Sequence, residues 1–450
     1  MVEVSNETNQ VATTKTEEEE EGEEQVGKKR KANPNIVVGG SLSIRARKAL
    51  EQIEKNRFAV DAWSVFLAEG TKKPIEEARE AYERFLEVFP TAAKYWKLYI
   101  EQEITARNYE RVEALFQKCL FTNLELELWK TYIRYIKLVK AGANDEHSSL
   151  EKAFDFVLKH MGADMNAAQV WRMYTQFLKN WPTQGQFSQG DKVEKIRRVF
   201  QRAIAMPISD VDTLWREYDK FEHSLNKALA RSLLADQQPK YLNAKMVAKE
   251  RQRLRQGLVH SVLARPPEPD SNPRNAYGVR DYQQAVIWQR VIDYEKSNPL
   301  SLDPKPLKQR VVFTYKQALL TLRHHFEIWY GLASYCRSQD YSEEAVQHLH
   351  AACVAMPGSQ LVHFAYADFQ EDRKNMAEAK AIYRALLDGL PVPAPVSLKQ
   401  KEKEREQRLL AEEEQAEAAR LGGSVSKQAK TDSGAVVVHE QQQQQQQQQQ

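Results

Sequence analysis

Tryptophan recurs along this sequence at an interval that is too long for one helix and too regular for an ordinary globular core. From Trp63 onward, successive members of the series lie 33, 33, 42, 44, 73 and 41 residues apart. The series consists of Trp63, Trp96, Trp129, Trp171, Trp215, Trp288 and Trp329. A period in this range is typical of repeat proteins, in which each unit needs its neighbours to bury its apolar face.

The sequence around Trp96 shows what one repeat contains. Trp96, Tyr99 and Glu103 are spaced i, i+3 and i+7, so they share one face of a helix. A second apolar-periodic segment, 115–120, follows, and the two segments predict a pair of short antiparallel helices. We therefore expect an all-α fold, an α-solenoid of about eight such pairs. The expected aromatic core positions are Trp63, Trp96, Tyr99, Trp129, Tyr132, Trp171, Tyr174, Trp215, Tyr218, Trp288, Trp329 and Tyr366.

These aromatic rings have an alternative interpretation, as a platform on which RNA bases stack. In this sequence they share their helix face with Leu, Ile and Phe, whereas a stacking platform would be interleaved with Lys and Arg. The pattern therefore favours rings packed between helices.

An acidic residue closes the apolar face in three of the repeats, at Glu103, Glu222 and Glu295. A buried carboxylate is costly unless it is paired. We expect a cation or backbone donor beside it, and an Arg or Lys on the second helix of the repeat would serve. The alternative is an exposed helix end.

Composition divides the chain into four parts. Residues 1–40 are expected to be disordered, because seven glutamates lie between positions 17 and 24 and bury nothing. Residues 41–257 hold repeats one to five. Residues 258–391 hold repeats six to eight, because the proline-rich stretch 265–275 cannot be helical and marks a boundary near 257. Residues 392–450 are a charged low-complexity tail that ends in ten glutamines.

The acidic segment is followed directly by four cations, Lys28, Lys29, Arg30 and Lys31. A basic run in a flexible segment is a candidate nuclear-import signal. The alternative is a solvated charge run.

A second basic segment closes a long helical pattern over 241–255. Its cations are Lys249, Arg251, Arg253 and Arg255. If they contact RNA phosphates, the affinity should fall steeply with salt. The alternative is a solvated helix face.

Composition also excludes several classes of function. No run of about 18 apolar residues is present, so no membrane span is expected. The net charge of +3 gives no whole-chain argument for nucleic acid. Three cysteines are too few for a disulfide framework and indicate a reducing compartment.

The sequence shows no constellation that would support catalysis. It has no Gly-rich phosphate loop and no His/Cys cluster with metal-ligand spacing. His348 and His350 are two residues apart, so they point apart on a helix. We expect no catalytic residue, cofactor or metal, and hence no enzyme.

The repeat itself resembles a known unit. The pattern Trp-x-x-Tyr-x-x-x-Glu in the first helix, with Tyr-Glu-Arg-Phe-Leu and then Pro in the second, is similar to the HAT repeat of RNA-processing scaffolds. Longer stretches resemble the suppressor-of-forked family, the large HAT subunit of cleavage stimulation factor. They are 89–101, 116–120, 199–203, 214–218, 295–300 and 364–368. The resemblance covers about 45–391.

This resemblance implies a right-handed superhelix with two HAT domains. It also implies a nuclear, non-enzymatic scaffold for pre-mRNA cleavage and polyadenylation, which contacts pre-mRNA mostly indirectly. The implied partners are an RNA-binding subunit, a WD-repeat subunit, the cleavage and polyadenylation specificity factor, and a second copy held through the C-terminal HAT domain. No membrane is implied. After Pro391, where typical members carry further repeats and a Pro-rich tail, this chain has its charged run and polyglutamine.

Two other functions remain as alternatives. A HAT-repeat splicing scaffold of the crooked-neck type would keep a more uniform period near 34 and would lack the break at 257–280. A direct RNA-binding protein would use the second basic segment.

Overall fold

The computed structural model describes residues 43–182, 186–260, 262–267 and 279–388, and every helix or strand assigned in these ranges is an α-helix. The helices are α1 (Ile44–Lys55), α2 (Val60–Gly70), α3 (Ile75–Val88), α4 (Ala93–Thr105), α5 (Tyr109–Cys119), α6 (Leu126–Val139), α7 (Glu146–Met161), α8 (Ala168–Asn180), α9 (Gln186–Ile204), α10 (Val211–Leu225), α11 (Lys227–Leu254), α12 (Val279–Lys296), α13 (Pro304–Ala318), α14 (Phe326–Ser338), α15 (Ser342–Ala355), α16 (Gln360–Asp372) and α17 (Met376–Asp388). The predicted all-α class is confirmed. The segment 1–40, with Lys28 to Lys31, and the tail 392–450 lie outside the described residues.

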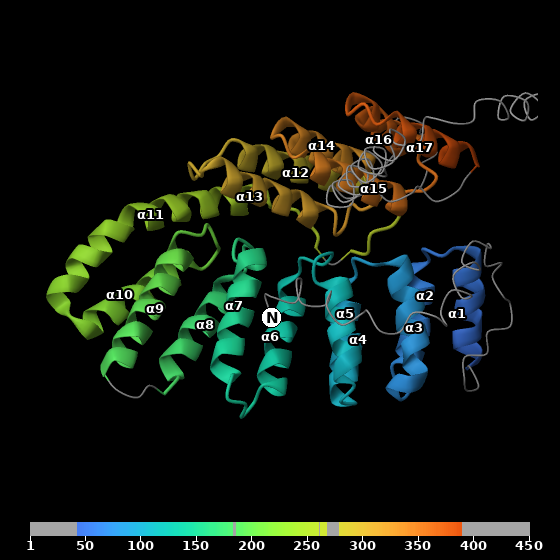
Figure 1. Ribbon diagram of the computed structural model, residues 1–450. Coiled ribbons are helices and arrows are strands. Elements are labelled where there is room, and N and C mark those ends of the chain that lie inside the picture. The colour runs from blue at the N-terminus through green and yellow to red at the C-terminus, as the bar shows by residue number, and fades with distance from the viewer. Residues whose placement is uncertain (1–42, 183–185, 261, 268–278, 389–450) are drawn as a thin grey trace, which may run out of the picture. The chain divides into compact units, whose positions relative to one another are not determined.

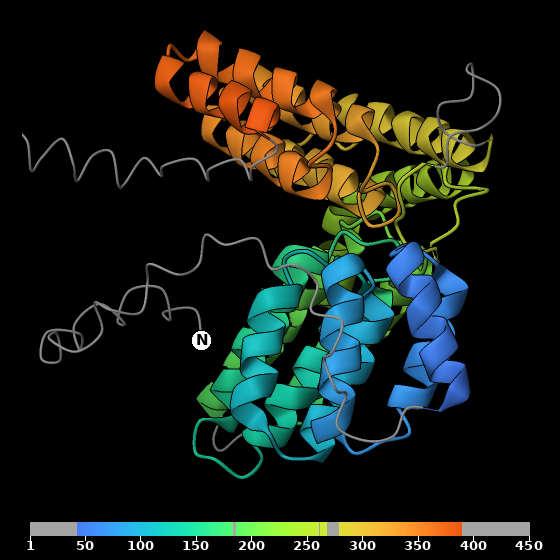
Figure 2. The same ribbon diagram turned by 90° about the vertical axis from the view of Figure 1, so that its right-hand side faces the viewer.

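Contacts group the chain into two units, residues 1–365 and 366–450. Within the first unit, consecutive helices pack in pairs: α2 with α3, α4 with α5, α6 with α7, α8 with α9, α10 with α11, α12 with α13, and α14 with α15. Figures 1 and 2 show the helices from α2 to α9 as successive hairpins, with each helix beside its partner. In the second unit, the described residues form the end of α16 and α17. The boundary near 257 stays a prediction.

Prolines follow the ends of several helices. The helices α3, α9 and α15 end at Val88, Ile204 and Ala355, each two or three residues before a proline. Proline lacks the amide hydrogen and disfavours a helical conformation in the residue before it. The helix α11 differs, because it continues through Pro239. It begins at Lys227, 14 residues before the helical pattern over 241–255 that the sequence predicted. Pro239 is exposed, so water can bond the carbonyl that the proline leaves unpaired.

The core runs continuously between the hairpins from Ala46 to Tyr241. Among the expected aromatic positions, Trp63, Trp96, Trp129, Trp171, Trp288, Trp329, Tyr99, Tyr174, Tyr218 and Tyr366 are buried. Tyr132 and Trp215 are half-buried against the core, and Trp215 stacks on Tyr241 with ring centroids 4.5 Å apart.

A recurrent hydrogen bond explains how these indoles tolerate burial. The Nε1 of Trp96 donates to the Pro90 carbonyl at 2.9 Å, and that of Trp129 donates to the Asn123 carbonyl at 2.9 Å. Trp63 and Trp329 make the same bond to the carbonyl six residues earlier. Each indole therefore fills the core and satisfies its one donor in the loop that precedes its helix.

Within the described residues, no helix is both long enough and apolar enough to cross a membrane.

Candidate interaction surface on the first helices

A cationic face lies on four adjacent first helices, α4, α6, α8 and α10. It consists of the residues one, five and eight positions after the tryptophan of each helix, a spacing that places them on one side. They are Lys97, Glu101, Ile104, Lys130, Arg134, Lys137, Arg172, Gln176, Lys179, Arg216, Lys220 and His223. Eight are Lys or Arg and one is acidic, and all twelve are at least partly exposed. We call these twelve residues the cationic face.

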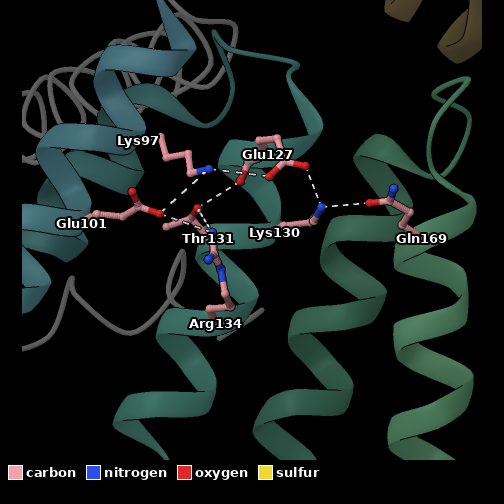
Figure 3. Close-up of polar contacts among 7 residues, drawn as sticks. All are labelled: Lys97, Glu101, Glu127, Lys130, Thr131, Arg134 and Gln169. Carbon is pink, nitrogen blue, oxygen red and sulfur yellow. Dashed lines mark hydrogen bonds and ion pairs between the residues drawn. The ribbon is translucent and has the colours of Figure 1, made fainter.

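Two glutamates on α4 and α6 partly neutralise one end of this face (Figure 3). Glu101 accepts from Arg134 at 3.4 Å, and Glu127 accepts from Lys130 at 2.6 Å. Lys97 lies between them, 4.0 Å from Glu101 and 3.6 Å from Glu127. Three cations therefore share two carboxylates.

The same network extends to α8 and is braced within α6. Lys130 also donates to Gln169 of α8 at 2.9 Å, and Arg134 donates to the Thr131 hydroxyl at 2.8 Å. These polar contacts link α4, α6 and α8 across their exposed side, where the aromatic core does not reach.

A surface pocket of about 510 Å³ opens in the cationic face between α8 and α10. Its walls are Gln169, Arg172, Met173, Thr175, Gln176, Lys179 and Glu217. The Lys179 ammonium lies over the rings of Phe200 and Phe221, at 4.9 and 5.5 Å from their centroids. Burial lowers the pKa of Lys179, and the nearby Glu217 raises it in part. An anion that entered this pocket would stabilise the charged form of Lys179.

The glutamates that end the apolar face of the repeats are buried and paired. Glu103 accepts two hydrogen bonds from Arg79 of α3, at 2.7 and 3.0 Å, and one from Asn108 at 2.7 Å. Glu222 is held in the same way by Arg197 of α9, at 2.7 and 2.9 Å. A cation beside each of these carboxylates, as predicted, is present. The predicted position was wrong for both, because each arginine lies on the second helix of the preceding hairpin and not on that of the glutamate's own repeat. Burial alone would raise the pKa of Glu103, but Arg79 and Asn108 outweigh it and the pKa is lowered.

Replacing Glu103 by alanine should lower the free energy of unfolding by about 2–3 kcal/mol, because Arg79 loses its partner and Asn108 its acceptor. Urea unfolding of both forms would measure the difference. Glu101→Ala, on the exposed side of the same helix, is the matched control and should cost about 1 kcal/mol or less. Equal losses for the two variants would contradict a special role for the buried pair.

The predicted RNA-contact residues do not form one surface. Lys249 and Arg253 are exposed, and Arg253 pairs with Glu250 at 2.5 Å. Arg255 is half-buried beside Trp288, 5.1 Å from the ring centroid. Arg251 is completely buried, so a phosphate group cannot reach it. The prediction of an RNA contact is therefore wrong for Arg251, because tertiary packing covers that side of α11.

Arg251 instead belongs to a buried ionic cluster. Its Nε lies 2.7 Å from Glu295 of α12, and Arg310 of α13 donates to the same carboxylate at 2.5 Å. Arg251 Nη1 also donates to the carbonyls of Pro207 and Ala163, at 2.7 and 3.3 Å. Burial lowers the pKa of Arg251, as does the charge of Arg310, while Glu295 raises it. The cluster thus joins α11, α12 and α13 to the loops before α8 and α10.

A histidine in the loop before α14 gives the fold a dependence on pH. His324 packs edge-on against Phe58, with centroids 5.4 Å apart. Burial lowers its pKa to about 4, with further lowering by Arg323 and His325. In the unfolded chain the His324 imidazole takes up a proton near pH 6.5, whereas in the folded chain it is protonated only at about pH 4. Stability is therefore complete above pH 6.5 and is lost as the pH falls below it.

At pH 5, His324 alone should remove about 1–2 kcal/mol of the stability present at pH 7. His324→Gln should make the difference between urea unfolding at pH 7 and pH 5 smaller by this amount. An undiminished pH dependence in His324→Gln would contradict the assignment.

Sequence reasoning missed one group of metal-ligand types. Cys336 of α14 and Glu344 and His348 of α15 bring their ligand atoms within 4.8 Å of one another. Only Glu344 and His348 show a sequence signal, an i, i+4 spacing; the cysteine comes from another helix. Such donors suit zinc, but Lys308 already neutralises Glu344 at 2.5 Å. A cation would have to displace that ammonium, and we assign no metal role to the group.

Comparisons with known proteins place the chain in a family. The family model described as "Suppressor of forked protein (Suf)" matches residues 45–449, which extends beyond the resemblance that ended near 391. The protein suppressor of forked of Drosophila melanogaster is 36% identical over 292 residues, 65% of this chain and 37% of that protein. Cleavage stimulation factor subunit 77 of Arabidopsis thaliana is 30% identical over 334 residues, 74% and 44% of the two chains.

A third relative is the mRNA 3′-end-processing protein rna14 of Schizosaccharomyces pombe, 30% identical over 367 residues, 81% of this chain and 48% of that one. The chain spans between about a third and a half of the length of these relatives. A crystal structure of CstF-77 superposes with a TM-score of 0.47 and 16% identity, covering 66% of this chain and 65% of that one. Because the family model matches nearly all of the sequence from α1 onward, this chain belongs to the suppressor-of-forked family.

Proposed function

We propose that this chain is a non-enzymatic scaffold subunit of the nuclear machinery that cleaves and polyadenylates pre-mRNA. The observation that carries the proposal is the family match over 45–449, together with relatives named for mRNA 3′-end processing and cleavage stimulation. A row of paired helices supports it physically, since such rows offer long surfaces to other proteins. The candidate import signal, Lys28 to Lys31, accords with action in the nucleus.

The finer proposal concerns partners. The chain bridges an RNA-binding subunit, a WD-repeat subunit and the specificity factor, and it pairs with a second copy through 258–391. Pre-mRNA is contacted mainly through these partners. The burial of Arg251 supports this last point, because it removes the central cation of the basic segment that would have contacted RNA directly.

Affinity purification of the tagged full chain from nuclear extract tests the proposal. Cleavage and polyadenylation subunits should be enriched over splicing subunits, as measured by quantitative mass spectrometry. Ribonuclease treatment before elution should leave the enrichment intact, because proteins and not RNA make the contacts. Enrichment of splicing subunits instead would favour the crooked-neck type of scaffold and overturn the proposal.

A further inference from the structure

We propose that the cationic face of α4, α6, α8 and α10 binds an extended acidic segment of a partner protein. This inference rests on the proposed scaffold function and names the chemistry of one of its partners. It starts from a recurrence: the residue directly after the tryptophan is Lys97, Lys130, Arg172 and Arg216 in four consecutive repeats.

The recurrence is confined to these four helices. The equivalent residue is Ser64 in α2, Gln289 in α12 and Tyr330 in α14. If these cations served only to keep the protein soluble, we would expect cations at the equivalent position of the other first helices as well. Five carboxylates border the face, at Glu127, Asp210, Asp212, Glu217 and Asp219, which lies 2.9 Å from His223. Even with these five carboxylates counted beside Glu101, the eight Lys and Arg residues outnumber the six carboxylates.

The arginines of α8 and α10 make weaker internal contacts than the cations of α4 and α6, which share Glu101 and Glu127. Arg216 bonds to uncharged groups, the Asp212 carbonyl and the Thr213 hydroxyl. Arg172 lies 3.8 Å from Asp210, which is itself 60% exposed. Among the described residues, Lys137 and Lys220 form no ion pair. These cations can accept a partner's carboxylates without first breaking a strong internal bond.

The distance between neighbouring helices of the cationic face matches the repeat of an extended peptide. The helix α4 packs against α6, and α8 packs against α10. Packed helices lie about 8–10 Å apart. An extended chain in the polyproline II conformation rises about 3.1 Å per residue with three residues per turn, so every third side chain points the same way about 9 Å apart. A segment with Asp or Glu at every third position can therefore place one carboxylate on each helix of the α4–α6 pair and of the α8–α10 pair. The pocket that Met173 and Lys179 line would accept one such side chain at its centre.

The composition of the face favours an acidic peptide over single-stranded RNA. Proteins that bind single strands combine cations with exposed aromatic rings on which the bases stack. None of the twelve residues of the cationic face is Phe, Tyr or Trp. The aromatic side chains of the four helices lie mainly in the core, on the other side.

Fluorescence anisotropy with the full chain tests the proposal. The probe is a fluorescein-labelled peptide of about 15 residues with Glu at every third position, long enough for four helix steps. The control probes are the same peptide with Gln for Glu and an oligouridine of equal length. The Glu peptide should bind tightest, and its affinity should fall at about 0.5 M salt because exposed charges are then screened.

Charge reversal locates the site. Arg172→Glu with Arg216→Glu should weaken binding of the Glu peptide by about tenfold or more, since two attractions become repulsions. The matched control is Lys240→Glu with Lys249→Glu, two exposed cations of α11 with the same change in net charge. It should alter the affinity less than about twofold. If the reversed variant melts early, Arg172→Gln with Arg216→Gln should still weaken binding several-fold.

Three results would overturn the inference: equal binding of the Gln peptide, equal loss in the α11 control, or tighter binding of oligouridine through Arg172 and Arg216. The last would make the face a nucleic-acid surface. If the unchanged chain fails to bind the Glu peptide but still co-purifies with processing subunits, only this inference is rejected. Peptide binding without such co-purification would reject only the proposed function.

Discussion

Replacing Arg251 by alanine is expected to lower the free energy of unfolding by about 3–5 kcal/mol, the usual cost of breaking a buried ion pair. Arg251 and Glu295 are both completely buried, and their atoms lie 2.7 Å apart. The change leaves Glu295 with Arg310 alone and also orphans the carbonyls of Pro207 and Ala163. Urea unfolding followed by circular dichroism would measure the loss.

Arg253→Ala is the matched control, because it lies two residues away on α11 and its side chain is 65% exposed. It should cost about 1 kcal/mol or less. Exchanging Arg251, Glu295 and Arg310 together for apolar residues of similar volume should recover most of the stability, since no charge is then left buried. Equal effects of the Arg251 and Arg253 substitutions would show that the cluster does not hold α11, α12 and α13 together.

Trp129→Ala is the second change with a large expected effect, about 3–5 kcal/mol, as for other large-to-small core substitutions. Trp129 is completely buried, lies beside Phe156 and His160, and donates its indole hydrogen to Asn123. Its loss leaves a cavity between α6 and α7 and an unpaired carbonyl in the loop before α6. The urea midpoint should fall accordingly.

Leu138→Ala is the control for this change, because Leu138 lies on the same helix and is 51% exposed. It should cost about 1 kcal/mol or less, since little apolar area is lost. Because neighbouring hairpins share one core, the loss in Trp129→Ala should spread to hydrogen-exchange protection in α4 and α7. An unchanged midpoint would mean that this ring does not stabilise the stack.

The comparison of sequence and structure separates two kinds of information. The hairpins, the aromatic phase around Trp96 and the acidic end of the buried face were readable from the sequence, because helical periodicity places residues three, four and seven apart on one side. The partner class of Glu103 was readable too, since an unpaired buried carboxylate is costly. Which arginine supplies it was not, because Arg79 lies 24 residues earlier in the neighbouring hairpin.

The cationic face could not be predicted from the sequence either. Each of its cations looks like an ordinary solvated residue on its own helix, and only the packing of α4, α6, α8 and α10 makes them neighbours. Arg251 and Arg253 are equally cationic in the sequence, yet one is buried and the other exposed, because α12 and α13 cover one side of α11.

By itself, the sequence determined the class of fold, the repeat and the family, since these depend on local periodicity and on order along the chain. The tertiary structure alone decided which charges are buried, which are shared between hairpins and which gather on one exposed face. The physical reason is that the cost of a charge depends on what surrounds it in space, and those surroundings come from distant parts of the chain.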